Sequence, residues 1–531
     1  MTDSQTPLQH EALAHFDHLA REAATGSSSG TGHRIDTHAN VVFLIGPLAY
    51  KMKRAVRFPF LDYSTLALRE AACKAEITCN RHNAPQIYRR AVALRRDADG
   101  TLSLEGDGEI VEWVVEMNRF DTSAQLDRIA EQGPLAPELC ERLARMMLEA
   151  HEQAPVHRDA GPGFLEELRS YISQNAQAFS EFPALFAPPA AQALTETADA
   201  RLTELAPLLL RRGEAGHVRL CHGDAHARNI VLLDGKPVLF DAIEFSPAIA
   251  TTDWLYDLAF LLMDLWDRDQ KPAANRVFNR YLDLRTLTAP GGADQGDEDA
   301  LRLLPFYLMM RACIRAKIAA AASLNQEGTA EKTSLEAEAR GYFALAQAFL
   351  GKAPARLVAI GGLSGSGKST LARALACDVG PAPGARILRT DVERKAHLGL
   401  RETDKAPAEA YTAEAAQAIY DKLDQRIRRV LGAGHAVIFD AVFARDAQRR
   451  DARDLATGAG ASFLGLWLDA PADVLKARVT ARTGDASDAD ADVVAFQLTL
   501  DTGTLEWPRL DASHGPEATL AQARQVLGTL S

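Results

Sequence analysis

Cysteines and long apolar runs are both scarce in this chain of 531 residues. No two cysteines form a C-x-x-C pair, which argues against a zinc site, and scattered cysteines fit a reducing cytosol. The most apolar stretch, near residues 258–265, is interrupted by Asp257 and Asp264, so no membrane span is predicted. The N-terminus also lacks the basic start and apolar run of a secretory signal. We therefore expect a cytoplasmic protein without a membrane partner.

Basic residues are outnumbered, with 59 Lys and Arg against 71 Asp and Glu, which gives a net charge of -12. Residues 355–531 hold 22 basic and 23 acidic residues, so nearly all of the negative charge falls on residues 1–354. An acidic surface repels a phosphate backbone, and we see no basic stripe with interleaved aromatic residues. We therefore expect no nucleic-acid partner. The oligomeric state is left open.

The length predicts two or three domains, and the pattern of elements changes near residue 351. Residues 1–32 are expected to form an N-terminal extension that includes the Gly- and Ser-rich loop Gly26–Gly32. Residues 33–350, the first half, begin with a predicted β-hairpin around residues 41–54 and become mostly helical after residue 137. After a linker at 351–356, residues 357–531, the second half, alternate strands and helices, which predicts a parallel sheet.

A phosphate-binding loop opens the second half. The sequence Gly362-Leu363-Ser364-Gly365-Ser366-Gly367-Lys368-Ser369 matches G-x-x-x-x-G-K-[ST], between an apolar strand and a helical segment. Glycines allow backbone N–H groups to cradle phosphates, and the helix N-terminus adds positive potential. Lys368 is expected to reach the β- and γ-phosphates and Ser369 to bind Mg²⁺. The nucleotide-binding residues predicted here are Gly362, Ser364, Gly365, Ser366, Gly367, Lys368, Ser369 and Thr370.

Carboxylates follow two later strands of the second half. Asp440 ends the strand AVIFD and is a candidate second ligand of the magnesium shell, or else a helix N-cap. Asp391 ends ILRTD and is a candidate base for an acceptor hydroxyl, with Arg394 as a candidate acceptor ligand; an N-cap and a surface arginine are the alternative. Arg478 and Arg482 share a helix face and are predicted to close over the transferred phosphoryl group.

An acidic run follows these arginines, formed by Asp485, Asp488, Asp490 and Asp492. We expect a solvated lid loop that partly pairs with the arginines. The second half resembles small P-loop kinases such as gluconate kinases, polynucleotide 5′-kinases and zeta-type toxins. That resemblance implies phosphoryl transfer to a hydroxyl, with Asp391 at the position of the acceptor-side base.

The first half contains a second nucleotide-binding pattern, His222-Gly223-Asp224-Ala225-His226-Ala227-Arg228-Asn229. Asp224 and Asn229 have the spacing of the protein-kinase loop H-R-D-x-x-x-x-N, in which the aspartate orients the acceptor hydroxyl and the asparagine binds magnesium. Asp241 ends the next strand, where a metal-binding aspartate belongs. Two carboxylates and an amide are suitable ligands and base for Mg·ATP.

A lysine on the predicted hairpin completes this pattern. Lys51 in LAYK lies where V-A-I-K places the phosphate-binding lysine, and Lys53 faces the same side of the strand, so both stay candidates. Glu76 on the following helix is the expected partner of that lysine, and Glu70 is the second candidate. No G-x-G-x-x-G loop precedes the lysine strand.

The loop H-G-D-x-x-x-x-N resembles that of the aminoglycoside phosphotransferase and choline kinase family. The resemblance implies a bilobal α+β protein-kinase-like domain, followed here by an α/β P-loop domain with a parallel sheet. The segments HRIDTHANVVFLIGPLAYKMKRAV, FPFLDYST and FDAIEF resemble a bacterial group that fuses these two kinds of domain. The resemblance implies an ATP- and Mg²⁺-dependent kinase, and a family label does not establish a drug substrate.

The acceptor is not settled by the sequence. Arg311 and Arg315 share one face of an apolar helix and are candidates for holding an anionic acceptor, or for salt bridges within the protein. The acidity of the first half favours a cationic acceptor instead. The leading prediction is a bifunctional small-molecule kinase with two ATP sites. The alternatives are one active half with a nucleotide-sensing other half, or a nucleic-acid 5′-kinase or toxin-like second half.

Overall fold

The computed structural model describes residues 7–25, 33–37, 39–58, 61–288, 297–324, 326, 328–351, 354–481 and 486–529, so the expected loop at 26–32 lies outside it. The chain packs into two compact units. Unit 1 comprises Met1–Gly133, Glu149–Glu167 and Leu209–Phe260, and unit 2 comprises Pro134–Leu148, Leu168–Leu208 and Leu261–Ser531. The last helices of the first half thus fall in one unit with the second half. Among the described helices, none is long and apolar enough to cross a bilayer.

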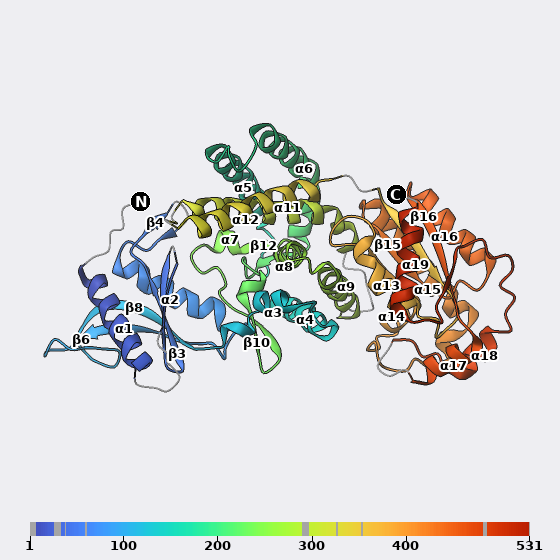
Figure 1. Cartoon of the computed structure of the whole chain (residues 1–531), viewed down its shortest axis with the longest axis horizontal. Helices are drawn as coiled ribbons and strands as arrows, with labels where there is room; N and C mark the ends of the chain where they lie inside the picture. Colours follow the sequence, from blue (N-terminus) through green and yellow to red (C-terminus); the bar gives the residue numbers. More distant parts are fainter. Residues whose placement is uncertain are drawn as a thin grey trace. The chain divides into compact units, whose positions relative to one another are not determined.

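An antiparallel sheet forms the start of unit 1 (Figure 1). The hairpin predicted near residues 41–54 turns at Gly46 and Pro47, and Gly46 has a φ of 58° that suits glycine. The helix α2 (Leu66–Asn80) follows, with Thr65 as its N-cap. In spatial order the strands are β1 (His33–Asp36), β2 (Asn40–Ile45), β3 (Leu48–Lys53), β8 (Glu109–Asn118), β6 (Tyr88–Arg96) and β7 (Leu102–Ser103).

The helix α1 (Pro7–Thr25) packs against this sheet, although the sequence analysis assigned no structure to it. Phe16 is fully buried and stacks on Phe43 of β2 with ring centroids 5.3 Å apart. The Gln9 side chain donates to the carbonyl of Lys53 at 3.0 Å. Because these contacts belong to the core of the sheet, α1 is an integral part of the fold around β3, the strand that carries both candidate lysines.

Short strands carry the expected catalytic loop of unit 1. The loop begins after β9 (Val218–Leu220) and ends where β10 (Ile230–Leu233) pairs with β11 (Lys236–Leu239). Helices dominate elsewhere, as predicted for residues 137–210 and 254–350. They are α3 (Leu126–Gln132), α4 (Pro137–Gln153), α5 (Gly161–Glu181), α6 (Pro188–Glu214), α8 (Trp254–Asp267), α9 (Lys271–Thr288), α11 (Leu304–Ser323) and α12 (Thr329–Phe349).

The second half contains a five-stranded sheet in which every pair of neighbours is parallel, so the predicted α/β class is confirmed. In spatial order the strands are β14 (Arg386–Arg389), β15 (Val437–Asp440), β13 (Arg356–Gly361), β16 (Ser462–Asp469) and β17 (Arg509–Asp511). β13 is central and leads into the phosphate-binding loop. Ligands of such sheets bind at the carboxyl ends of the strands, which is where Asp440 lies.

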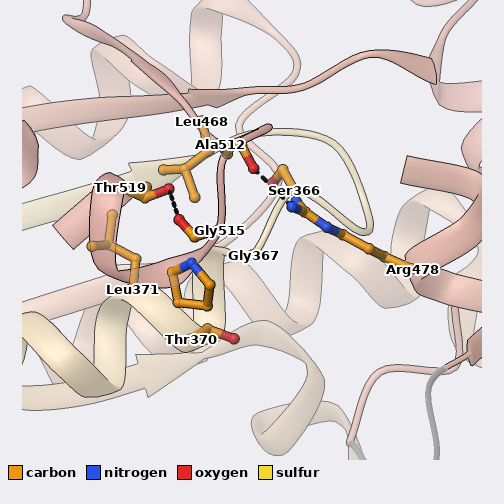
Figure 2. A pocket seen from close by; sticks show the side chains of 10 residues that line it. Ser366, Gly367, Thr370, Leu371, Leu468, Arg478, Ala512, Gly515 and Thr519 are labelled. Carbon is orange, nitrogen blue, oxygen red and sulfur yellow. Dashed lines mark hydrogen bonds between the residues drawn. The ribbon is translucent and has the colours of Figure 1, made fainter. Parts of the chain in front are cut away.

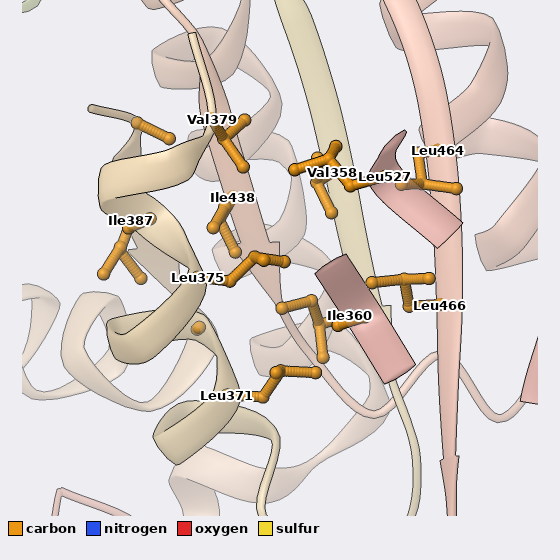
Figure 3. Packing of buried hydrophobic residues seen from close by; sticks show 14 of the residues in the cluster. Val358, Ile360, Leu371, Leu375, Val379, Ile387, Ile438, Leu464, Leu466 and Leu527 are labelled. Carbon is orange, nitrogen blue, oxygen red and sulfur yellow. The ribbon is translucent and has the colours of Figure 1, made fainter. Parts of the chain in front are cut away.

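Helices on this sheet bury an apolar core (Figure 3). Leu371 and Leu375 of α13 (Lys368–Leu375) face Val358 and Ile360 of β13, and Leu527 of α19 (Pro516–Gly528) joins them. Apolar residues two apart on β13 and four apart on α13 therefore hold the helix against the strand. The loop between the two elements is fixed in place as a result. The remaining longer helices are α14 (Thr390–His397), α15 (Ala413–Gly432), α16 (Asp446–Gly458), α17 (Ala472–Ala481) and α18 (Ala491–Gln497).

Candidate active sites

A buried carboxylate holds the predicted catalytic loop in unit 1. Asp257, in the first turn of α8, accepts the backbone N–H of Gly223 at 2.8 Å and that of His222 at 3.3 Å. The same carboxylate also contacts the His151 ring at 3.2 Å. Gly223 has a φ of 84°, which lets the backbone turn toward Asp257. Sequence reasoning missed this anchor, although a charged residue beside an apolar run was a signal for it.

The loop brings Asp224 and Asn229 together as their spacing predicted. The Asn229 amide donates to the Asp224 carboxylate and to its main-chain carbonyl, each at 3.0 Å. The Asp224 side chain is 37% exposed, and His226 lies 3.4 Å from it. The Asp224 carboxylate is therefore partly open to solvent, from which an acceptor hydroxyl can approach.

Asp241 lies two residues after β11, not at its end as predicted, and has a φ of 64°, an uncommon backbone conformation for a residue with a side chain. Its N–H donates to the Tyr88 hydroxyl at 3.1 Å, and the next N–H, of Ala242, donates to Asn80 at 2.8 Å. Burial raises the pKa of Asp241, but the Lys51 ammonium at 2.6 Å outweighs burial and holds that pKa below its usual value. A carboxylate kept ionised in this way is suited to bind a cation.

Both candidate lysines reach Glu76, which is fully buried on α2. Lys51 lies 2.8 Å from one oxygen of Glu76, and Lys53 lies 2.5 Å from the other. Glu70, the second candidate partner, instead pairs with Lys74 at 2.5 Å on the helix surface. The lysine spacing of two residues thus places both ammonium groups on one carboxylate.

The second partners of the two lysines differ, and this suggests different roles. Lys51 also contacts Asp241, whereas Lys53 also contacts Glu244, which accepts the Tyr63 hydroxyl at 2.7 Å. Burial lowers the pKa of Lys53, but Glu76 and Glu244 outweigh it and raise the pKa above the ordinary value. Lys51 therefore lies beside the candidate metal ligand, and Lys53 ties the segment after Asp241 to β3.

This division predicts different outcomes for Lys51→Met and Lys53→Met. The Lys51 variant should lose about 10²-fold in kcat/KM with a stable fold, since it removes the charge that is predicted to hold phosphate. The Lys53 variant should lose about 3–5 kcal/mol of stability, because Glu244 keeps a buried charge without its ammonium. Transfer kinetics and thermal unfolding of both variants test this, with the exposed Lys74→Met as control. A stable Lys53 variant with impaired ATP use would reverse the assignment.

The phosphate-binding loop in the second half has the backbone that its glycines predict. Gly365 and Gly367 have φ values of 82° and 94°, and a Cβ on Gly365 would come 2.5 Å from the carbonyl oxygen of Leu475. Lys368 begins α13, and its ammonium donates to the Leu363 carbonyl of the same loop at 3.0 Å. The loop therefore ends at a helix N-terminus with a lysine folded over it.

Three polar side chains meet beside this loop. Ser369 donates to Asp440 at 2.5 Å, and Arg389 lies 3.2 Å from Asp440 and 3.0 Å from the Ser369 hydroxyl. A hydroxyl and a carboxylate at the mouth of a phosphate-binding loop are hard oxygen ligands that fit Mg²⁺. A cationic side chain already rests on both of them. Asp440 is not a helix N-cap, since the next helix, α16, is capped at Arg445.

Asp391 and Arg394 lie in α14, whose N-cap is Arg389, so the N-cap alternative for Asp391 does not hold. They pair with each other at 2.9 Å, and the Arg394 guanidinium lies 4.7 Å from the centroid of the Tyr411 ring. The base and the acceptor ligand expected at these positions are thus adjacent to each other.

Arg478 lines a pocket beside the loop together with Ser366, Gly367 and Thr370 (Figure 2). It donates to the carbonyl of Ala512 at 2.9 Å, as the dashed line in Figure 2 marks. Arg478 therefore lies beside the loop and the first turn of α13, where it remains the candidate for contact with the transferred phosphoryl group. Arg482, the other arginine expected at this position, lies outside the described residues.

The acidic run expected to pair with these arginines has other partners where it is described. Asp488 binds the Lys395 ammonium at 2.7 Å and also accepts the Tyr411 hydroxyl. Asp490 caps α18 by accepting the N–H groups of its first turn. Asp488 therefore ties this segment to α14, while Asp485 lies outside the described residues.

Arg311 and Arg315, the candidate acceptor ligands of the first half, lie on α11. The Arg315 guanidinium is 3.1 Å from Glu338 and 5.5 Å from the centroid of the Tyr342 ring. Arg311 is almost completely buried. A protein carboxylate thus already neutralises Arg315, which is the salt bridge given above as the alternative to an anionic acceptor.

Comparisons with known proteins agree with this geometry. Residues 90–295 match the model of the phosphotransferase enzyme family, and residues 357–500 match that of an AAA domain. Uncharacterized proteins of Mycobacterium tuberculosis and Mycobacterium bovis are each 28% identical over 504 residues, which are 92% of this chain and 94% of theirs. The domain order predicted from the two motifs is therefore confirmed.

Solved structures with some likeness cover each half separately. A choline/ethanolamine kinase family protein from Mesorhizobium loti is 16% identical with a TM-score of 0.38, over 65% of this chain and 95% of its own. A gluconokinase from Sinorhizobium meliloti is 21% identical with a TM-score of 0.24, over 34% of this chain and 98% of its own.

Proposed function

We propose that this chain, an ATP-dependent phosphotransferase that joins a phosphotransferase-family domain to a P-loop kinase domain, uses two separate Mg·ATP sites to phosphorylate hydroxyl groups of small molecules. The observation that carries the proposal is that each half gathers its own complete set of groups. One set has Asp224, Asn229 and Asp241 beside Lys51. The other has Ser369 and Asp440 at 2.5 Å beside the phosphate-binding loop.

In the first half, Lys51 is placed to hold phosphate oxygens while Glu76 keeps the ammonium on β3. Asn229 and Asp241 would hold Mg²⁺, which neutralises charge on the phosphates when bound. Asp224 is assigned to the acceptor, and it accepts or orients the proton of the attacking hydroxyl. Asp257 keeps the loop backbone in place for that task.

In the second half, the loop N–H groups and Lys368 are placed to hold the phosphates of the nucleotide. Ser369 and Asp440 would hold the metal, and Arg478 lines the neighbouring pocket. Asp391, at the start of α14, is assigned to the proton of the acceptor hydroxyl, with Arg394 beside it. In this mechanism the protein mainly positions the reacting groups and stabilises their charge, as is general for phosphoryl transfer.

A screen of acceptors with the full-length chain and radiolabelled ATP tests this function. The panel includes choline, aminoglycosides, sugar acids and phosphorylated sugars, and product identification shows which hydroxyl is modified. Both transfers should need Mg²⁺ or Mn²⁺, since the assigned ligands are hard oxygen donors. Excess chelator should therefore remove both activities, and added Mg²⁺ should restore them. Undiminished transfer in chelator, or turnover at one half only, contradicts the proposal.

A further inference from the structure

Arg389, the last residue of β14, contacts both groups assigned to the metal of the second half. Its Nε lies 3.2 Å from Asp440 Oδ2 and its Nη2 lies 3.0 Å from Ser369 Oγ. The Arg389 side chain is only 7% exposed, so its charge is poorly screened by water. In this arrangement the guanidinium neutralises Asp440, and an arriving metal ion must displace or repel it.

A second carboxylate is in reach of the same guanidinium. Glu402 Oε1 lies 3.7 Å from Arg389 Nη1, while its other oxygen accepts a hydrogen bond from Arg280 Nη1 of α9. Arg280 also lies 2.6 Å from Glu141 of α4 through its Nε. Negative and positive groups thus alternate from Glu141 to Asp440. Arg280 and Arg389 compete for Glu402, and Glu402 and Asp440 compete for Arg389.

Helix α9 is held against the sheet, so the place of Arg280 is well defined. Asn279 accepts the N–H of Ile387 at 2.7 Å and donates to the carbonyl of Ala385 at 3.0 Å. Asn275, one turn earlier, donates to the same carbonyl at 3.1 Å. These bonds replace a neighbouring strand at the outer edge of β14. Because Arg280 follows Asn279 directly, α9 presents it beside the strand that carries Arg389.

We propose that Arg389 is a positioning cation of the second-half metal site and that Arg280 of α9 sets how readily Arg389 leaves Asp440. When a divalent ion takes Ser369 and Asp440, Arg389 moves to Glu402, which lies 3.7 Å away. Arg280 holds Glu402 back and so opposes this move. Since α9 belongs to the matched phosphotransferase-family region, the first half adjusts metal binding in the second. The inference rests on the proposed function of the second site.

Two substitutions should move the metal affinity in opposite directions. Arg280→Met releases Glu402 to pair with Arg389, which frees Asp440, so Mn²⁺ should bind about three- to tenfold more tightly. Glu402→Gln removes the alternative partner, so Arg389 stays on Asp440 and Mn²⁺ should bind about tenfold more weakly. The double variant should behave like Glu402→Gln alone, because Arg280 acts only through Glu402.

Mn²⁺ binding to the full-length chain is measured by electron paramagnetic resonance with a non-hydrolysable ATP analogue, which needs no turnover. Ser369→Ala identifies the part of the signal that belongs to the second half. Lys271→Met is the matched control, because Lys271 begins the same helix and its side chain is exposed. Melting curves without metal show that each variant is folded, and the control should leave Mn²⁺ affinity unchanged.

A shift of both single variants in the same direction, or a double variant that sums the two effects, overturns the inference and leaves the proposed function standing. If Ser369→Ala leaves the whole Mn²⁺ signal intact, the second half has no such metal site. That result overturns the proposed function of the second half and this inference with it.

Discussion

Asp224→Ala should lower phosphoryl transfer by the first half about 10²–10⁴-fold while the second half continues to use ATP. The expected loss is large because Asp224 is the one carboxylate of the catalytic loop that faces solvent, where the acceptor hydroxyl must arrive. Lys51, Glu76 and Asp241 do not depend on it for their contacts. Nucleotide affinity should therefore change little, so the loss appears in kcat.

The fold should tolerate this change, since Asp224 gives up only its contacts with Asn229 and His226. Asp224→Asn separates shape from proton acceptance, because an amide keeps the size of the side chain but does not accept a proton at neutral pH. The asparagine variant should therefore be as inactive as the alanine variant. Asp107→Ala, an exposed aspartate outside the site, serves as the control. Single-turnover transfer to an identified acceptor gives the rate. Retention of the rate in Asp224→Asn would remove Asp224 from its proposed role.

Lys368→Ala should lower ATP use by the second half about 10²–10³-fold and leave the first half unaffected. The ammonium is the side-chain cation of the loop itself, and it donates to the Leu363 carbonyl at 3.0 Å. Its charge is thus directed at the loop, where developing negative charge on the phosphates must be stabilised. Nucleotide binding and turnover should both fall.

Calorimetric titration with ATP and separate transfer assays on the acceptor of each half measure this outcome. Lys405→Ala removes an exposed lysine of the same half and controls for net charge. The two sites share no residue, so one substitution should silence one half only. Loss of both transfers in either Lys368→Ala or Asp224→Ala would show that the chemistry of the sites is coupled.

Motif spacing predicted the parts of both sites that lie close together in sequence. The loop around Asp224 and Asn229 and the loop before Ser369 are local, so their geometry follows from a few turns of backbone. The sequence also placed Asp440 at the end of a strand, which a parallel sheet then brings to the loop. These residues could be identified because each motif is a short continuous segment whose own backbone forms the loop.

Contacts between distant segments were not predictable in the same way. Lys51 and Lys53 face one side of β3, and only the positions of Asp241 and Glu244 distinguish them. Asp257 anchors a loop 34 residues away through backbone N–H groups, which carry no sequence signature. Such contacts depend on tertiary packing. A buried charged or amide side chain needs a partner, and the sequence does not show which distant residue that partner is.

The asparagines of α9 looked like ordinary polar helix residues, yet both are buried against β14. Their amides form hydrogen bonds with the backbone at the outer edge of β14. The sequence of the second half gives no sign that another segment covers this edge. Compactness accordingly places α9 in one unit with the P-loop sheet.

This arrangement has a consequence for how the chain can be divided. The linker at 351–356 separates two sequence motifs, but a cut there would leave the outer edge of β14 without Asn275 and Asn279. An uncovered edge strand is a template for pairing with another chain. Any recombination that exchanged the first half for another kinase would have to supply equivalent amides. The boundary between the two sequence motifs is therefore not a boundary at which the second half can be cut free without exposing β14.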